Sequence, residues 1–109
     1  MSKFNKADDG KSRVDLIESK FILGIGHVLG EGAIEYGENN WKNASVEDIK
    51  RIRASLMRHT LAVLDGEVID KKSGKPHTYH IGCNAMFLDY FDRMAQNAID
   101  IEKAINKMI

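Results

Sequence analysis

The sequence predicts an all-α protein, a helical bundle that assembles into an oligomer. Apolar residues recur every three or four positions in three long stretches, which is the period of an amphipathic helix. Turns that contain glycine, asparagine or proline separate these stretches. No stretch shows the sustained alternation of apolar and polar residues that is typical of a strand. Together these observations favour three main helices.

A chain of 109 residues is expected to form one domain with a real but modest core. Residues 1–12 are polar, with a turn at Asp8, Asp9 and Gly10, and predict a flexible N-terminal arm. A single domain is expected over residues 13–109. The hydrophobic content of 43% and the charged content of 29% are those of an ordinary globular protein rather than a disordered one.

Charge and cysteine content exclude several classes of function. Lysine plus arginine and aspartate plus glutamate each number 16, so no nucleic acid or anionic membrane partner is expected. The single cysteine, Cys83, cannot form a disulfide within the chain, which suits a reducing cytoplasm. The N-terminus lacks the apolar core of a signal peptide, and no apolar run approaches the ~18 residues of a membrane span. We therefore expect a cytoplasmic protein.

The first predicted helix covers about residues 13–37. Its apolar face is spaced by three or four residues and consists of Ile17, Phe21, Ile25, Val28, Gly32 and Tyr36. Four glycines weaken the prediction, because each costs up to ~1 kcal/mol relative to alanine inside a helix. They could instead allow a second helix to pack closely. An asparagine-rich loop follows at residues 39–45.

Ser45 and Asp48 predict the start of the second helix, because they have the spacing of a capping box with aspartate in place of glutamate. Glu47 and Asp48 fall in its first turn, where the helix dipole favours negative charge. The apolar face runs through Ile49, Ile52, Leu56 and Val63. Gly66 stands where a helix commonly ends, and residues 71–76 predict a turn with two helix breakers.

The third predicted helix runs from about residue 77 to the end of the chain. Its apolar positions are Ile81, Ala85, Leu88, Ala95, Ala98, Ile101, Ile105 and Met108. This helix is apolar for longer than a three-helix monomer could easily cover. A homodimer or homotetramer that buries the helix between copies would remove the exposed face.

A row of ionisable side chains lies on one face of the first predicted helix. His27, Glu31, Glu35 and Glu38 are separated by four, four and three residues, so they share a face between two apolar stripes. Glu35 and Glu38 form an E-x-x-E pair, whose oxygens could bind one or two hard cations such as Mg²⁺. Taken alone, such a row is more commonly a solvated acidic face.

The densest cluster of reactive side chains surrounds the turn between the second and third helices. Glu67 and Asp70 form an E-x-x-D pair, and His77, His80 and Asn84 follow on one face of the third helix. The N-terminus of that helix attracts anions through its backbone N–H groups. Carboxylates that bind Mg²⁺ beside imidazole and amide donors would suit a phosphate substrate. The alternative is a capping and turn cluster, which is at least as common for any one of these residues.

Zinc is a second metal that this segment could bind. His77, His80 and Cys83 offer two nitrogens and one sulfur on one helix face. Structural zinc sites usually have four ligands, often in paired short spacings, and the chain has one cysteine. We therefore favour Mg²⁺ and interpret Cys83 as a small packed side chain.

Cations and an aromatic side chain elsewhere could contact a nucleotide. Four cations could hold a triphosphate: Lys11, Arg13, Arg58 and His59. Each of them is more often a solvated or salt-bridged side chain. Trp41, the only tryptophan, could stack on a base while Asn40 reads the base edge. Equally, Trp41 could close the core beneath its loop.

Six short motifs resemble those of a known enzyme family. They are KSRVDLI (11–17), YGENNW (36–41), RH (58–59), GEVID (66–70), SGKPH (73–77) and HIGCN (80–84). They resemble the phage dATP/dGTP diphosphohydrolase family, the MazZ-like group of the all-α NTP pyrophosphohydrolases related to MazG. The resemblance covers roughly residues 11–88. Its most specific part is the run 58–84, where order, spacing and residue types all match.

This resemblance implies a helical fold that oligomerises and a Mg²⁺- or Mn²⁺-dependent reaction. Water would attack the α-phosphate of a purine deoxynucleoside triphosphate, dGTP or dATP or both, and give the monophosphate and pyrophosphate. The superfamily pattern of E-x-x-E followed by E-x-x-D corresponds to Glu35 and Glu38 and to Glu67 and Asp70. The family often has a basic residue where this chain has Glu35, which makes Glu31 an alternative ligand. If phage-encoded, the protein would act in the host cytoplasm.

The expected site has three groups of residues. Cation binding and catalysis are expected from Glu35, Glu38, Glu67 and Asp70, with Glu31 as a further metal ligand. Phosphate contacts are expected from Lys11, Arg13, Arg58, His77 and His80. Base and sugar contacts are expected from Asn40, Trp41 and Asn84.

Two other functions fit the same residues, and a third does not. A non-catalytic nucleotide-binding module would bind nucleotide without turnover. A structural helical oligomer would use the polar cluster only as caps, and metal would not stabilise it. An HD-type phosphohydrolase needs an adjacent His-Asp pair on a helix, which the chain lacks.

Overall fold

The computed structural model describes Ala7 and residues 9–109, and these residues form three α-helices. The helices are α1 (Ser19–Tyr36), α2 (Val46–Leu64) and α3 (His77–Met108). Two short 3-10 helices, η1 (Val14–Leu16) and η2 (Asn40–Asn43), precede α1 and α2. The described residues contain no strand, only an isolated antiparallel bridge between Ile69 and Pro76. The all-α prediction is therefore confirmed, while most of the expected N-terminal arm lies outside the described residues.

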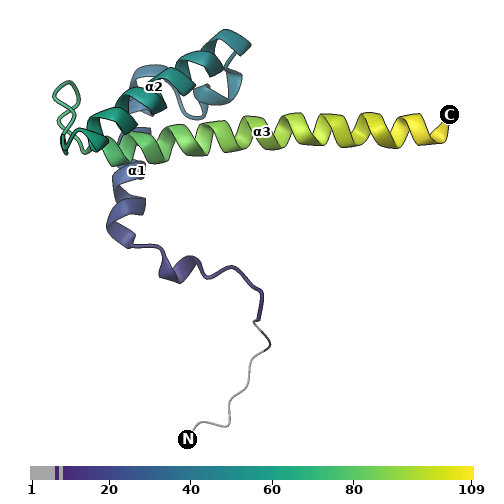
Figure 1. Cartoon of the computed structure of the whole chain (residues 1–109), viewed down its shortest axis with the longest axis horizontal. Coiled ribbons are helices and arrows are strands. Elements are labelled where there is room, and N and C mark those ends of the chain that lie inside the picture. Colours follow the sequence, from purple (N-terminus) through teal and green to yellow (C-terminus); the bar gives the residue numbers. More distant parts are fainter. Residues whose placement is uncertain (1–6, 8) are drawn as a thin grey trace, which may run out of the picture.

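The long helix α3 forms the axis of the molecule, and both other helices pack on its N-terminal half (Figure 1). In the same view α2 lies along α3, whereas α1 crosses it. The C-terminal half of α3 extends beyond the other two helices. Among the described residues no helix has the combination of length and apolar character that a bilayer span requires.

The helix α1 begins later than the apolar spacing predicts. The pattern indicates a start near Arg13, but Val14–Leu16 forms η1 and the backbone is extended at Ile17 and Glu18. The side chains of Val14, Leu16 and Ile17 are exposed, so no packing supports an additional turn. Helices in proteins are stabilised mainly by such packing, which explains why the pattern alone overestimates the helix.

The predicted limits of α2 are confirmed by its capping contacts. The backbone N–H of Asp48 donates to the Ser45 hydroxyl at 3.2 Å, and the N–H of Ser45 donates to the Asp48 carboxylate at 3.0 Å. At the other end Gly66 has a φ of 89°, in the left-handed region that favours glycine. The N–H of Glu67 then donates to the carbonyl of Ala62 at 2.9 Å, which closes the last turn.

Two glycines allow α1 and α3 to cross closely. A Cβ at Gly24 would fall within 3.0 Å of the Tyr79 ring, so α3 can place this ring against α1 only because Gly24 has no side chain. On the opposite side of the crossing, a Cβ at Gly82 would lie 2.9 Å from Phe21 and 2.8 Å from Ile25. Close packing is therefore the role of Gly24, whereas Gly26, Gly30 and Gly32 have no atom within 4 Å of the Cβ position.

The buried interior of one chain is small. Among the described residues Cys83 is the sole buried hydrophobic side chain, at 2% exposed, while His77 and Asn84 are buried polar residues. Trp41 of η2 adds a half-buried aromatic cluster, with its ring 4.7 Å from Phe87 and 5.0 Å from Tyr90 between centroids. The polar residues His77 and Asn84 are thus among the most buried side chains of the described residues.

Candidate functional site

Two pockets stand out on the surface of the described residues. The larger, of about 1070 Å³, lies between the end of α1, the loop with η2, and the facing parts of α2 and α3. The smaller, of about 480 Å³, lies where the end of α2 meets the loop before α3. The smaller pocket is lined by Ser55, Arg58, His59, Asp70, Lys72, Ser73 and His80. Its ionisable side chains make it the candidate functional site.

The loop between α2 and α3 is a compact turn that directs Asp70 toward the first turn of α3. The N–H of Asp70 donates to the carbonyl of Lys75 at 2.8 Å, and the N–H of Gly74 donates to the carbonyl of Asp70 at 2.7 Å. The carboxylate of Asp70 accepts a further hydrogen bond from the N–H of Ser73 at 3.1 Å. These bonds hold the carboxylate in place before any ligand binds.

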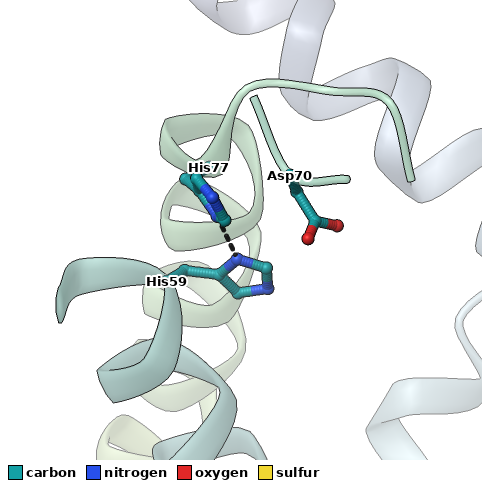
Figure 2. A group of neighbouring side chains, drawn as sticks. All are labelled: His59, Asp70 and His77. Atoms are coloured by element: carbon teal, nitrogen blue, oxygen red, sulfur yellow. Dashed lines mark hydrogen bonds between the residues drawn. The ribbon is translucent and has the colours of Figure 1, made fainter. Parts of the chain in front are cut away.

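Three side chains from three segments converge at this loop (Figure 2). His59 comes from α2, Asp70 from the loop and His77 from the first position of α3. The Nδ1 atoms of His59 and His77 lie 2.8 Å apart and form a hydrogen bond. Each of the three residues offers a nitrogen or oxygen atom within 4.8 Å of the others, which is the arrangement of a possible metal site.

His80 completes the cluster on the pocket side. Its ring stacks on His59 with 4.6 Å between centroids and an angle of 8° between the planes. Its Nε2 atom forms a hydrogen bond with the Ser73 hydroxyl at 2.7 Å and lies 3.8 Å from an Asp70 carboxylate oxygen. His80 is therefore held between a hydroxyl, a carboxylate and another imidazole.

The local environment favours the neutral forms of His59 and His80 and the ionised form of Asp70. Burial lowers the pKa of His59 and of His80, and neighbouring histidines lower both further. Hydrogen bonding by Ser73 lowers the pKa of the Asp70 carboxyl. At neutral pH the cluster thus offers imidazole lone pairs and a carboxylate charge, which are the forms that bind cations.

His77 is buried, and its second ring nitrogen has no hydrogen-bond partner among the described residues. Its Nε2 atom lies 3.2 Å from a carboxylate oxygen of Glu67, close enough for an ion pair if His77 is protonated. The orientation of the two groups is not that of a hydrogen bond, however, so Nε2 stays unsatisfied. A small rotation of the half-exposed Glu67 side chain would pair them.

The structure brings some of the predicted site residues together. Arg58, Asp70 and His80 line the same small pocket, and His77 lies close to Asp70 without lining it. Glu67 joins them through His77. Asn84 lies further along α3, where its amide donates to the Ser55 hydroxyl at 3.1 Å. Within one chain this hydrogen bond connects α3 to α2.

Other predicted residues lie apart from this cluster within one chain. Glu38, Asn40 and Trp41 line the larger pocket instead, so the two expected acidic pairs do not share a pocket. Glu35 is exposed on α1 and lines neither pocket. One chain alone therefore does not bring the four carboxylates of the expected cation site together. The site stays a prediction.

The remaining predicted residues contact nearby charges or aromatic rings. Glu31 forms an ion pair with Lys75 of the loop, and Lys75 lowers the pKa of its carboxyl. Arg13 pairs with Asp15 at 2.8 Å, and Lys11 is exposed. Trp41 packs on α3 aromatic rings, which agrees with its interpretation as a side chain that closes the core.

Two residues of the pocket were not assigned these roles from the sequence. The sequence indicates His59 only as a possible phosphate contact and does not indicate Ser73 as a site residue. The available signal for His59 is its spacing of four from Ser55, which places both on one face of α2. That this face meets His77 and Asn84 depends on how α2 packs on α3, which spacing within one helix does not reveal.

Cys83 has no role in this cluster. Its thiol donates a weak hydrogen bond to the carbonyl of Ile25 at 3.6 Å, at the crossing of α1 and α3. Burial raises the pKa of the Cys83 thiol to about 11. A buried, protonated thiol is a poor metal ligand, which agrees with its interpretation as a packed side chain.

Comparisons with known proteins link the chain to one family. The family model described as dATP/dGTP diphosphohydrolase, N-terminal, matches residues 1–100. A protein of Salmonella phage PMBT28 named dATP/dGTP diphosphohydrolase is 30% identical over 83 residues, which cover 76% of this chain. The chain spans 28% of the length of this relative. No solved structure matches the chain.

Proposed function

The chain belongs to the dATP/dGTP diphosphohydrolase family, and we propose that it hydrolyses purine deoxynucleoside triphosphates to the monophosphate and pyrophosphate. The observation that carries the proposal is the convergence of Arg58, Asp70 and His80 at one pocket, with His77 next to Asp70. The expected substrates are dGTP, dATP or both.

The small pocket has the charge that a triphosphate requires. Arg58 and Lys72 line it, and a guanidinium and an ammonium group are the usual partners of phosphate oxygens. His80 and the Ser73 hydroxyl add groups that could donate hydrogen bonds to the same oxygens. These side chains would bind and orient the substrate, and the pocket would limit the water around it.

Mg²⁺ or Mn²⁺ is the proposed cofactor, and the donor atoms at the pocket suit it in part. The carboxylates of Glu67 and Asp70 offer the oxygen atoms that hard cations prefer, and hydrogen bonding keeps Asp70 ionised. When bound, the cation would neutralise charge on the phosphates. Glu38, with Glu35 or Glu31, would supply the remaining oxygens.

We further propose that a second copy of the chain brings this acidic pair to the pocket. Within one chain Glu38 lines the larger pocket and Asp70 the smaller, so self-association is the simplest way to combine them. A homodimer or homotetramer would then contain sites shared between subunits. In such a site Glu35 or Glu31 could accept the proton of the attacking water, since both carboxylates are exposed on α1.

The first test measures pyrophosphate release from dGTP and dATP with Mg²⁺ or Mn²⁺. The Asp70→Asn variant should lower kcat by more than about 100-fold, because it removes a carboxylate that would hold the cation beside the phosphates. Arg58→Ala should mainly raise KM, because it removes a phosphate contact. Asp92→Asn, in an exposed part of α3 outside both pockets, is the matched control.

Unchanged turnover in Asp70→Asn would refute the assignment. Nucleotide binding without turnover in the unmodified protein would favour the non-catalytic binding module instead.

A further inference from the structure

We propose that His59, Asp70 and His77 form a binding site for a divalent transition-metal ion of the zinc and cobalt class. The ion would join the end of α2, the loop and the start of α3. This site differs from the carboxylate-held Mg²⁺ or Mn²⁺ of the proposed function in its two imidazole donors, while Asp70 is common to both sites. It does not depend on the proposed function.

The donor atoms select the class of metal. Two imidazole nitrogens and one carboxylate oxygen lie within 4.8 Å of one another. Imidazole suits zinc, cobalt and nickel, whereas Mg²⁺ prefers oxygen ligands and keeps several waters. Two histidines with one carboxylate form a known set of three protein ligands that leaves a coordination position open.

Little movement is needed for the two histidines to share an ion. Their Nδ1 atoms are already 2.8 Å apart. Two nitrogens bound to one tetrahedral zinc ion lie about 3.4 Å apart, given zinc–nitrogen distances near 2.1 Å. The rings would therefore separate by only about half an ångström, which small side-chain rotations supply.

Glu67 stands where a supporting carboxylate is expected. Histidines that bind metal usually donate their other ring N–H to a carboxylate or carbonyl group. The other nitrogen of His77, Nε2, is buried without a hydrogen-bond partner and lies 3.2 Å from Glu67. If His77 binds the ion through Nδ1, its Nε2–H donates to Glu67, and the unsatisfied nitrogen is explained.

The fold has a use for such an ion. Within one described chain the buried hydrophobic core consists of Cys83, which is little for 109 residues. Small domains with weak cores commonly gain stability from a structural metal or another cross-link. An ion held by His59, Asp70 and His77 would add a cross-link among α2, the loop and α3 at a point where hydrogen bonds now connect them.

The test uses Co²⁺ as a spectroscopic probe on the full chain after chelator treatment and dialysis. Co²⁺ should bind with one ion per chain and give visible d–d absorption, which Zn²⁺ but not excess Mg²⁺ should abolish. Zn²⁺ should also raise Tm by mass action. His59→Gln and His77→Gln should each weaken Co²⁺ binding at least about tenfold, since even loss of a supporting residue commonly costs that much.

His27→Gln is the matched control, because His27 is an exposed histidine on α1 away from the cluster. It should leave the Co²⁺ spectrum unchanged. If the buried His77→Gln variant fails to fold, the half-buried His59→Gln variant decides the result.

Absence of Co²⁺ absorption, displacement by Mg²⁺, or equal binding in His59→Gln would overturn the proposal and leave the histidines as a hydrogen-bonded packing pair. Failure of the proposed function has a different signature. The site stands and the function fails if Co²⁺ binds but dGTP and dATP are not hydrolysed. The function stands and the site fails if Mg²⁺ supports hydrolysis and Co²⁺ gives no spectrum.

Discussion

At the scale of single residues, three imidazole rings share one small volume. His59 forms a hydrogen bond with His77 and stacks on His80, so none of the three is isolated from another ionisable ring. Protonating two neighbouring rings would place like charges side by side in a partly desolvated place, which is unfavourable. His59 and His80 therefore resist protonation in acid, and this resistance has a measurable consequence for stability.

We predict that acid destabilises the chain as pH falls below about 6.5. The folded pKa values of His59 and His80 are lowered, mainly by burial, from the ordinary value of 6.5. As pH falls below that value, the unfolded chain binds protons first, so the free energy of unfolding decreases. The stability that the neutral His59 and His80 contribute is fully present above their unfolded pKa. It is lost as pH falls from there through their folded pKa values. Tm measured across this range, without added metal, tests the direction.

His59→Gln and His80→Gln should each reduce this pH dependence, whereas His27→Gln should leave it nearly unchanged. The lowered pKa of Asp70 adds nothing in this window, because its ordinary value is 3.8 and its contribution disappears only in stronger acid. Higher Tm at pH 5 than at pH 7 would contradict the prediction.

At the scale of elements, α1 carries four glycines with different roles. Gly24 allows the Tyr79 ring of α3 to approach, whereas Gly26 has open space around its Cβ position. The two positions are in the same helix and two residues apart, so they share nearly the same helix propensity. Substituting each glycine by alanine therefore separates the effect of helix–helix packing on stability from the effect of helix propensity.

Gly24→Ala should lower the free energy of unfolding by about 1–3 kcal/mol, because the new methyl group clashes with Tyr79. Gly26→Ala should raise it by up to about 1 kcal/mol, because alanine is the better helix former. Urea denaturation of both variants measures the two changes. Equal stability would mean that Tyr79 moves aside, and a destabilised Gly26→Ala would indicate that another chain covers this face.

The sequence predicted the elements best where side chains cap the backbone locally. Ser45 with Asp48, and Gly66, mark the limits of α2, and both contacts occur as expected. The start of α1 was predicted too early because it depends on packing that η1 does not have. The meeting of His59 with His77 escaped prediction for the same reason, since it arises from contact between two helices.

At the scale of the whole molecule, one chain leaves a long apolar seam uncovered. Beyond the aromatic cluster under Trp41, exposed side chains on α3 follow a spacing of four, three, four and three: Met94, Ala98, Ile101, Ile105 and Met108. This is the heptad spacing of helices that pair with another helix. A long, partly apolar helix without a partner is unfavourable in water, and a second copy offers a helix with the same seam.

We predict that the chain self-associates through this seam. Light scattering after size exclusion should give two or four times the mass of one chain. Ile101→Glu with Ile105→Glu should lower that mass or the stability of the assembly, because it places charges in the seam. Lys103→Glu, an exposed position between them, is the control. A stable, monomeric unmodified chain would contradict this prediction.

The part of the site that lies within one chain could be predicted from the sequence, whereas the part that depends on the assembly could not. Asp70, His77 and His80 are close in sequence, so one loop and one helix turn suffice to gather them. Glu35 and Glu38 belong to another element, and their meeting with Asp70 depends on the assembly rather than on one chain. Sequence motifs identify such residues as a set without stating which copy supplies each.

The loop between α2 and α3 is closed by its own backbone hydrogen bonds, among them Asp70 to Lys75 and His77 to Val68. A segment already ordered in this way loses little conformational entropy when a ligand arrives. We therefore expect nucleotide to bind to a preorganised loop, without a disorder-to-order transition of that loop. Hydrogen exchange of the loop amides would then be slow before nucleotide is added, and would change little afterwards.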